Sequence, residues 1–224
     1  MIHPTDRIIY IDNHLIAVTK PAGLLTQPDR NTDESLIDQT RQWIKDKYNK
    51  PNNVFLGLVH RLDRNVSGVV LFARTSKAAS RLSKQFREGT PKKYYRAIVL
   101  GKLKAKHTTL VHYLRKEKSL RATVFPRETP TAKRSELSYE VINSLGKKSL
   151  LEVSLSTGRF HQIRAQMAFI GHPILGDVKY GAPEPLPNQE IGLYAHKLVF
   201  NHPISSDEIT LTALEPKTWE KFKL

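Results

Sequence analysis

Hydrophobic residues occur along the chain in short runs separated by polar segments. Apolar, β-branched runs bounded by Pro, Gly, Asn or Asp are typical of β-strands. Such runs recur from the first residues to the last, so the sequence predicts a sheet that uses most of the chain. The expected strands are residues 8–11, 15–18, 69–74, 91–99, 137–142, 150–155 and 209–213.

Three segments instead repeat apolar residues at the spacing of a helix. They cover residues 36–48, 76–87 and 163–170, and each would bury one apolar stripe. Thr32 or Asp33 is expected to cap the first helix, because short polar side chains accept hydrogen bonds from the first turn. A further short helix is expected near the C-terminal aromatic residues.

With these strands and helices, we expect the α+β class, with a mixed, largely antiparallel sheet and flanking helices. The length of 224 residues is that of one sizeable hydrophobic core. We therefore expect residues 1–224 to form a single domain.

Charge is strongly biased along this chain. There are 36 Lys or Arg residues against 21 Asp or Glu, a formal net charge of +15. Residues 74–134 hold 18 basic and three acidic side chains, so this segment accounts for the whole excess. Concentrated positive charge favours a polyanionic partner, although a set of solvated surface lysines would give the same count.

Several classes of protein are disfavoured by what the sequence lacks. It has no cysteine, so it has no disulfide framework and no thiolate metal site, which fits a cytoplasmic protein. The first residues have no secretory signal pattern, and no apolar run is long enough to span a membrane. The histidines at 161, 172, 196 and 202 lack metal-binding spacing, and we expect neither a metal nor another cofactor.

Two segments are dense in reactive or ionic side chains. In the first, Asp63 stands between Arg61 and Arg64, directly before a strand. The residue types alone favour a surface acid screened by its neighbours, although a strand edge also holds a catalytic group rigidly. In the second, His161 and Arg164 are three residues apart, which makes them neighbours on a helix.

Five motifs stand in order along the chain: KPAGLL from Lys20, HRLDRNVSGVVLFAR from His60, KYYRA from Lys93, TGRFHQIR from Thr157 and GHPILGDVKYG from Gly171. These blocks, spread across residues 8–213, resemble the RluA-type pseudouridine synthases, whose catalytic aspartate usually lies in HRLDxxTSGLLLFA. A final block from Ile191 to Pro203 is also similar. Val66 replaces the usual Thr, and Ala165 with Gln166 replaces a common Val-His pair.

The resemblance implies an isomerase that converts uridine to pseudouridine in structured ribosomal or transfer RNA. Asp63 would be the catalytic nucleophile, Tyr95 would stack on the target base, and Arg164 would pair with Asp63. Whether the carboxylate attacks C1′ of the ribose or the uracil ring stays open. The remaining residues expected to contact the substrate are Arg61, His60, Leu193, His161 and Arg159.

The resemblance also implies a catalytic domain that acts alone. Many family members carry a small RNA-binding domain first, and only about seven residues precede the first expected strand here, so we expect that domain to be absent. We expect a monomer whose partner is an RNA stem-loop, with no membrane contact. Two alternatives stay open: a non-catalytic RNA-binding protein, and a carboxylate-dependent glycosidase or nuclease acting on RNA.

Overall fold

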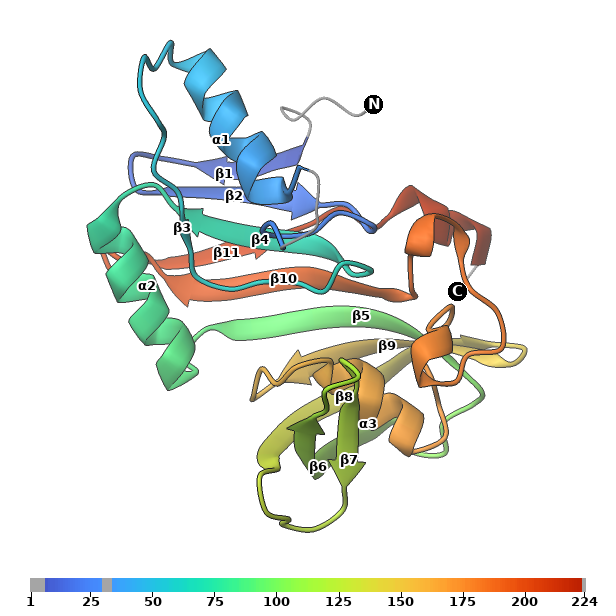
Figure 1. The fold of residues 1–224 in the computed structure, drawn as a ribbon. Coiled ribbons are helices and arrows are strands. Elements are labelled where there is room, and N and C mark those ends of the chain that lie inside the picture. Colours follow the sequence, from blue (N-terminus) through green and yellow to red (C-terminus); the bar gives the residue numbers. More distant parts are fainter. Residues whose placement is uncertain (1–6, 30–33, 223–224) are drawn as a thin grey trace. The chain divides into compact units, whose positions relative to one another are not determined.

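The computed structural model describes residues 7–29 and 34–222, with side chains described up to residue 220 (Figure 1). Contacts between Cα atoms group the chain into two compact units. The first unit is Met1–Pro91 with Ala195–Leu214, and the second is Lys92–Tyr194 with Glu215–Leu224. Each unit is described by itself.

The first unit contains a sheet whose strands follow the order β1-β2-β4-β10, with β3 paired to β4 and β11 paired to β10. The first two residues of β10 belong to the second unit. Strands β1 and β2, β2 and β4, and β10 and β11 pair antiparallel. The strands are β1 (Ile8–Ile11), β2 (Leu15–Lys20), β3 (Gly57–Leu58), β4 (Ser67–Ala73), β10 (Leu193–Asn201) and β11 (Glu208–Thr212).

Strand β4 is the central element of the first unit. All seven of its residues are buried, as expected for an apolar run inside a sheet. Gly68 has φ +120°, and a Cβ atom there would lie 2.3 Å from the carbonyl oxygen of Ala195. Only glycine therefore permits this close approach of two backbones.

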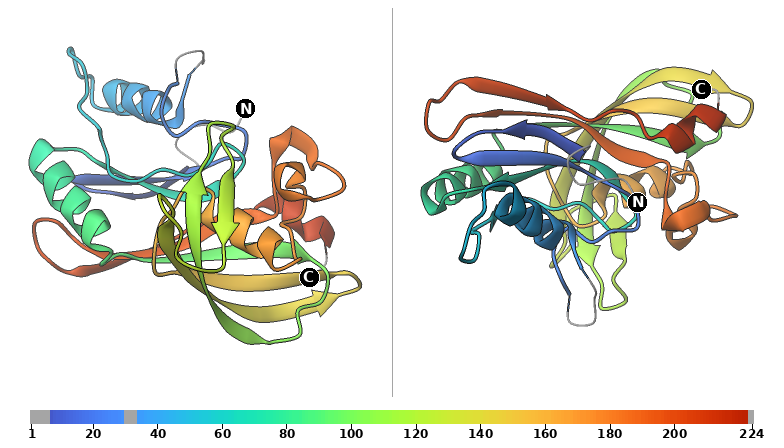
Figure 2. Two further views of the ribbon diagram at one scale, coloured as in Figure 1. Left: turned by 60° about the horizontal axis from the view of Figure 1, so that its bottom comes forward. Right: turned by 90° about the horizontal axis from the view of Figure 1, so that it is seen from above.

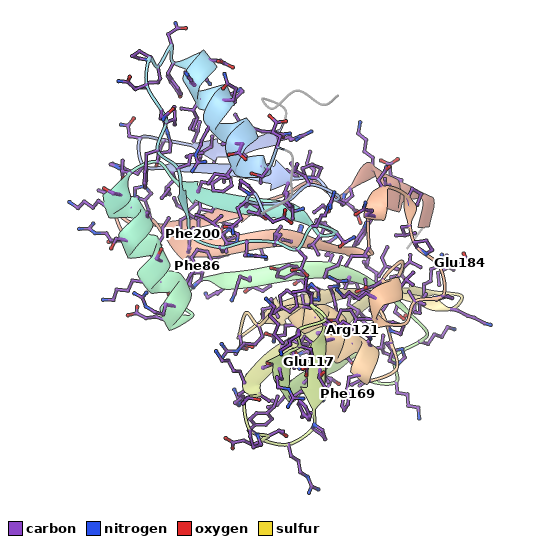
Figure 3. The ribbon with its side chains drawn as sticks, viewed as in Figure 1. Phe86, Glu117, Arg121, Phe169, Glu184 and Phe200 are labelled. Carbon is purple, nitrogen blue, oxygen red and sulfur yellow. The ribbon has the colours of Figure 1, made fainter. Side chains whose placement is uncertain are left out.

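Two helices complete the first unit. Helix α1 (Leu36–Lys47) begins after Ser35, whose backbone N–H and hydroxyl both donate to the Asp38 carboxylate; Thr32 and Asp33, the predicted caps, lie outside the described residues. Helix α2 (Ser76–Glu88) is capped by its preceding threonine and ends at a glycine. Phe86 packs against the core cluster that contains Phe200 (Figure 3). The basic residues of α2, Lys77, Arg81, Lys84 and Arg87, are exposed.

The second unit contains the strand order β5-β9-β8-β6-β7, and every pairing in that order is antiparallel. Helix α3 (Gln162–Phe169) packs against β6 and β7, as both views of Figure 2 show. The strands are β5 (Lys92–Leu100), β6 (His107–Lys116), β7 (Ala122–Phe125), β8 (Lys133–Leu145) and β9 (Lys148–Leu155), and the 3-10 helices are η2 (Val178–Tyr180), η3 (Pro187–Gln189) and η4 (Lys217–Phe222).

The predicted fold class, α+β with a largely antiparallel sheet and flanking helices, is confirmed, and the predicted strands and helices are found within a few residues of their expected ends. The basic segment 74–134 divides between the two units. None of the helices formed by the described residues has the length and apolar character that crossing a bilayer requires.

Candidate functional site

Asp63 lies in a turn of the first unit, directly before β4. The N–H of Val66 donates to the Asp63 carbonyl at 3.1 Å, which closes the turn. Thr26 fixes the preceding residue, because its hydroxyl donates to the Leu62 carbonyl at 3.0 Å and accepts from the Leu62 N–H at 3.2 Å. Asp63 is partly exposed and Leu62 is buried. The turn is therefore anchored to the core while the acid lies at the surface.

Lys20, a residue that the sequence analysis did not single out, organises the backbone beneath this turn. Its side chain is fully buried, and its ammonium donates to the carbonyls of Pro21, Leu24 and Arg64 at 2.9, 2.7 and 3.0 Å. Burial lowers the pKa of Lys20 to about 7, while the negative charge of Asp63 acts in the opposite direction. The Lys20 ammonium and the Asp63 carboxylate therefore attract each other electrostatically.

The other predicted site residues of this turn differ in their surroundings. His60 Nε2 accepts a hydrogen bond from the Leu71 N–H at 2.9 Å, and its ring stacks on Phe86 with centroids 4.8 Å apart. The imidazole of His60 therefore fixes β4 and α2 in place. Arg61 is exposed.

Tyr95 lies on β5 in the second unit and is partly buried. Its register partner on β9 is Val153. Because side chains alternate along a strand, Tyr95 shares a face of β5 with Lys93, and Tyr94 points to the opposite face. A Cβ atom on Gly158 would lie 3.4 Å from the Lys93 ammonium, so the Tyr95 face of β5 is the one that approaches the loop before α3.

Arg164 is buried on α3 and forms an ion pair with Asp177. Its Nε and Nη2 atoms donate to the two carboxylate oxygens of Asp177 at 2.6 and 2.8 Å. The side chains are only 4% and 1% exposed. A bidentate pair of this kind fixes the plane of the guanidinium. The sequence analysis quoted Asp177 within a motif but gave it no role.

His161 precedes α3 rather than lying within it. It has a left-handed backbone conformation with φ 52°, which is uncommon for a residue other than glycine. Its Nδ1 atom lies 2.9 Å from the hydroxyl of Tyr180, and its ring stacks on Phe160. Burial, and then the positive charge of Arg164, lower the pKa of His161 to about 3, so the imidazole is neutral at physiological pH.

The last two predicted residues also lie in the second unit. Arg159 is exposed in the loop before α3, where its Nε donates to the Arg134 carbonyl at 3.1 Å. Leu193 begins β10 and is buried, with 3% of its surface exposed.

The structure brings the predicted residues together in two groups. His60, Arg61 and Asp63 share one turn of the first unit, while His161 and Arg164 share the start of α3 in the second. Asp63 and Arg164 belong to different units, and their pairing stays a prediction.

The histidines discussed above make protein contacts. His172 lies 2.9 Å from the Leu100 carbonyl through Nδ1, and His202 lies 3.0 Å from the Asp12 carboxylate through Nε2. Among the described residues, no group of three or more His, Asp or Glu side chains is placed to hold a metal ion.

Comparison with known proteins places this chain in a family. A sequence model of the family described as RNA pseudouridylate synthase matches residues 14–169. The dual-specificity RNA pseudouridine synthase RluA of Haemophilus influenzae is 35% identical over 92% of this chain and 91% of that protein. The ribosomal large subunit pseudouridine synthase C of Vibrio vulnificus is 33% identical, over 96% of this chain and 68% of that protein.

Solved structures agree on the fold. Human RNA pseudouridylate synthase domain containing 4 superposes with a TM-score of 0.81 at 22% identity, covering 97% of this chain and 91% of that one. The matched family model and the 35% identity to RluA place the chain in the RNA pseudouridylate synthase family. The prediction that it is an RNA pseudouridine synthase, and hence an isomerase, is confirmed.

Proposed function

We propose that this protein converts uridine to pseudouridine at defined sites in ribosomal or transfer RNA, with Asp63 as the nucleophile. The observation that carries the proposal is the 35% identity over 92% of the chain to a protein named as a dual-specificity RNA pseudouridine synthase. The matched family segment, residues 14–169, contains Asp63, Tyr95 and Arg164.

The surroundings of Asp63 support its role. Hydrogen bonds from Thr26 and Val66 to main-chain atoms hold the turn and so fix the backbone from which the Asp63 carboxylate projects. The nearby Lys20 ammonium attracts the ionised acid, which is the form that a nucleophile requires. The reaction breaks the bond from ribose C1′ to uracil N1 and forms one from C1′ to C5, while a proton leaves C5 and one is gained at N1.

The base must leave the RNA stack before it can react. Unstacking costs a few kcal/mol, and stacking on an aromatic side chain recovers about 1–3 kcal/mol per base. Tyr95 is the aromatic residue to which we assign this stacking. Arg61, exposed beside Asp63, is suited to a phosphate or to the space that the base vacates, and Arg164 is the cation that we pair with Asp63.

The Asp63→Asn variant tests the proposal. We expect it to bind RNA nearly as well as the wild type and to form no pseudouridine, because the amide is a poor nucleophile. Asp46→Asn, which changes an exposed acid on α1, is the matched control and should retain activity. Pseudouridine mapping of cellular RNA with and without the protein identifies the modified uridines, and mass spectrometry should find the RNA mass unchanged.

Two results would contradict the proposal. Product formed by Asp63→Asn at the wild-type rate would remove Asp63 as the nucleophile. RNA that is bound but never modified by the wild type would instead favour the alternative of a non-catalytic RNA-binding protein, and a change in RNA mass would favour hydrolysis.

A further inference from the structure

A basic cavity of about 540 Å³ opens on the surface of the second unit. It is formed where the end of β6, the start of β8 and the loop before α3 meet. All of its lining residues lie in the described part of the chain; four are cations and none is a carboxylate. They are Leu114, Arg115, Lys116, Thr131, Lys133, Gly158, Arg159 and Phe160.

The cations at the cavity are positioned by neighbouring groups. Arg115 Nε pairs with the Glu117 carboxylate at 2.9 Å, beside the turn to β7 where Figure 3 labels Glu117. The Lys116 ammonium lies 4.7 Å from the centroid of the Phe160 ring. Arg159 is oriented through Nε by a backbone carbonyl, and Lys133 is exposed. Glu117 is therefore the acid that offsets part of the charge.

A fifth cation approaches the cavity from β5. The Lys93 ammonium lies close to Gly158, where a Cβ atom would be 3.4 Å away. Burial, and then the positive charge of Arg159, lower the pKa of Lys93. Like charges held this close repel one another, and an anion bound among them would relieve the repulsion.

The ligand is an anion rather than a stacked base. The His161 ring stacks on the Phe160 ring, with centroids 3.8 Å apart and an angle of 18° between the ring planes. The Lys116 ammonium also lies over the Phe160 ring. A nucleobase therefore has no open aromatic surface there. Lysine and arginine side chains around a cavity instead match the phosphate groups of RNA.

We propose that this cavity binds a phosphodiester of the RNA substrate through Lys116, Lys133 and Arg159. The inference rests on the proposed function and deepens it, because it assigns a contact for RNA outside the Asp63 turn. Tyr95 and Lys93 share one face of β5, so the strand that carries the stacking residue also borders the cavity. The contact supplies affinity and orientation, while the reaction takes place elsewhere.

The double variant Lys116→Gln/Lys133→Gln tests this inference. Its matched control is Lys102→Gln/Lys147→Gln, which removes two exposed lysines from the same unit; Lys147 lies in the turn between β8 and β9, at the other end of that hairpin from Lys133. The probes are unmodified transcripts of ribosomal RNA and transfer RNA. KM and kcat for pseudouridine formation are measured together with the salt dependence of RNA binding.

We expect the cavity variant to raise KM about tenfold or more, with kcat within about twofold of the wild type. Its plot of log binding constant against log salt should become shallower by about 0.7–0.9 for each lost phosphate contact. The control should match the wild type in both measurements. A cavity variant with wild-type KM and salt slope, or one that lowers kcat alone, would overturn the inference.

The test separates this inference from the proposed function. A wild-type protein that forms no pseudouridine in any transcript or in cellular RNA refutes the proposed function. In that case RNA binding alone still tests the cavity: an unchanged salt slope in Lys116→Gln/Lys133→Gln refutes it, and a shallower slope supports it.

Discussion

The Asp63 turn of the first unit and the Arg164 region of the second are fixed in different ways. The Asp63 turn is held through main-chain atoms, by the ammonium of Lys20 and the hydroxyl of Thr26. Arg164 is held through its own guanidinium, by the buried carboxylate of Asp177. The contacts described for the Asp63 turn end on its backbone, whereas Arg164 is fixed by a buried ion pair of its own side chain.

This difference determines what substitutions can reveal. Replacing Asp63 leaves in place the hydrogen bonds that Lys20, Thr26 and Val66 make to main-chain atoms of the turn. Replacing Arg164 removes half of a buried ion pair, so a loss of activity combines chemistry with stability. Arg164 is therefore better studied through its partner Asp177, and the Asp63 turn through Lys20.

The largest effect is expected from Asp177→Asn. The amide would remove the carboxylate that holds the Arg164 guanidinium in its buried bidentate pair, at a cost of about 3–5 kcal/mol in the free energy of unfolding. Urea denaturation measures this loss. The double replacement Arg164→Met/Asp177→Leu should be less destabilised than Asp177→Asn, because an apolar pair leaves no buried charge.

Glu88→Gln provides the control for that measurement. It breaks an exposed pair with Lys84 at 3.8 Å, and it should change the free energy of unfolding by less than about 1 kcal/mol. An Asp177→Asn protein as stable as Glu88→Gln would show that the buried pair does not fix Arg164.

A smaller loss is expected from Lys20→Met. Methionine fills a similar volume but leaves the carbonyls of Pro21 and Leu24 without their donor, whereas the Arg64 carbonyl keeps the Gly23 N–H at 2.8 Å. Unpaired buried acceptors cost about 1–3 kcal/mol. Removing the ammonium also removes the desolvation cost of its buried charge, which offsets part of this loss. We expect a net loss of about 2 kcal/mol in the free energy of unfolding.

Limited digestion with trypsin shows whether that loss is local. Arg61 and Arg64 are exposed in the turn, so cleavage after them should be faster in Lys20→Met than in the wild type. Lys47→Met, at the exposed end of α1, is the control and should not change the cleavage rate there. Equal cleavage in all three proteins would mean that Lys20 does not hold the Asp63 turn.

The sequence was sufficient to predict most of the elements and the Asp63 turn. The β4 residues from Val69 to Ala73 are all apolar and all buried, so the pattern of this run reflects its environment directly. The Tyr95 assignment rests on a motif, and alternation along β5 places it on the Lys93 face. The motif TGRFHQIR likewise singles out Arg164 as a candidate site residue.

The contacts that hold the site were not predictable in the same way. Lys20 ends an apolar strand, where a lysine is usually solvated, although a following Pro and Gly leave carbonyls without local donors. Asp177 and Tyr180 lie in the segment GHPILGDVKYG, but their partners Arg164 and His161 lie on α3 and directly before it. Only the tertiary fold brings these two segments together. Periodicity alone also does not predict the backbone just before α3. There the Gln162 side chain accepts a hydrogen bond from the Arg159 N–H at 2.9 Å.

The smallest expected effect concerns the pH dependence of stability and His161. The pKa of His161 is about 3 in the folded protein, against an ordinary value of 6.5. Between these values the unfolded chain binds a proton that the folded protein does not, so stability falls as the pH is lowered from 6.5 toward 3. Above pH 6.5 the contribution of His161 is complete and constant.

The free energy of unfolding relative to His161→Asn should therefore fall only in acid, since asparagine tolerates the left-handed backbone and does not titrate. His161→Gln, which also does not titrate, should give a pH profile of the same shape as His161→Asn. If the difference between wild type and His161→Asn stays constant down to pH 4, the imidazole is not held neutral by its surroundings, and the arrangement of cations around the start of α3 would have to be reconsidered.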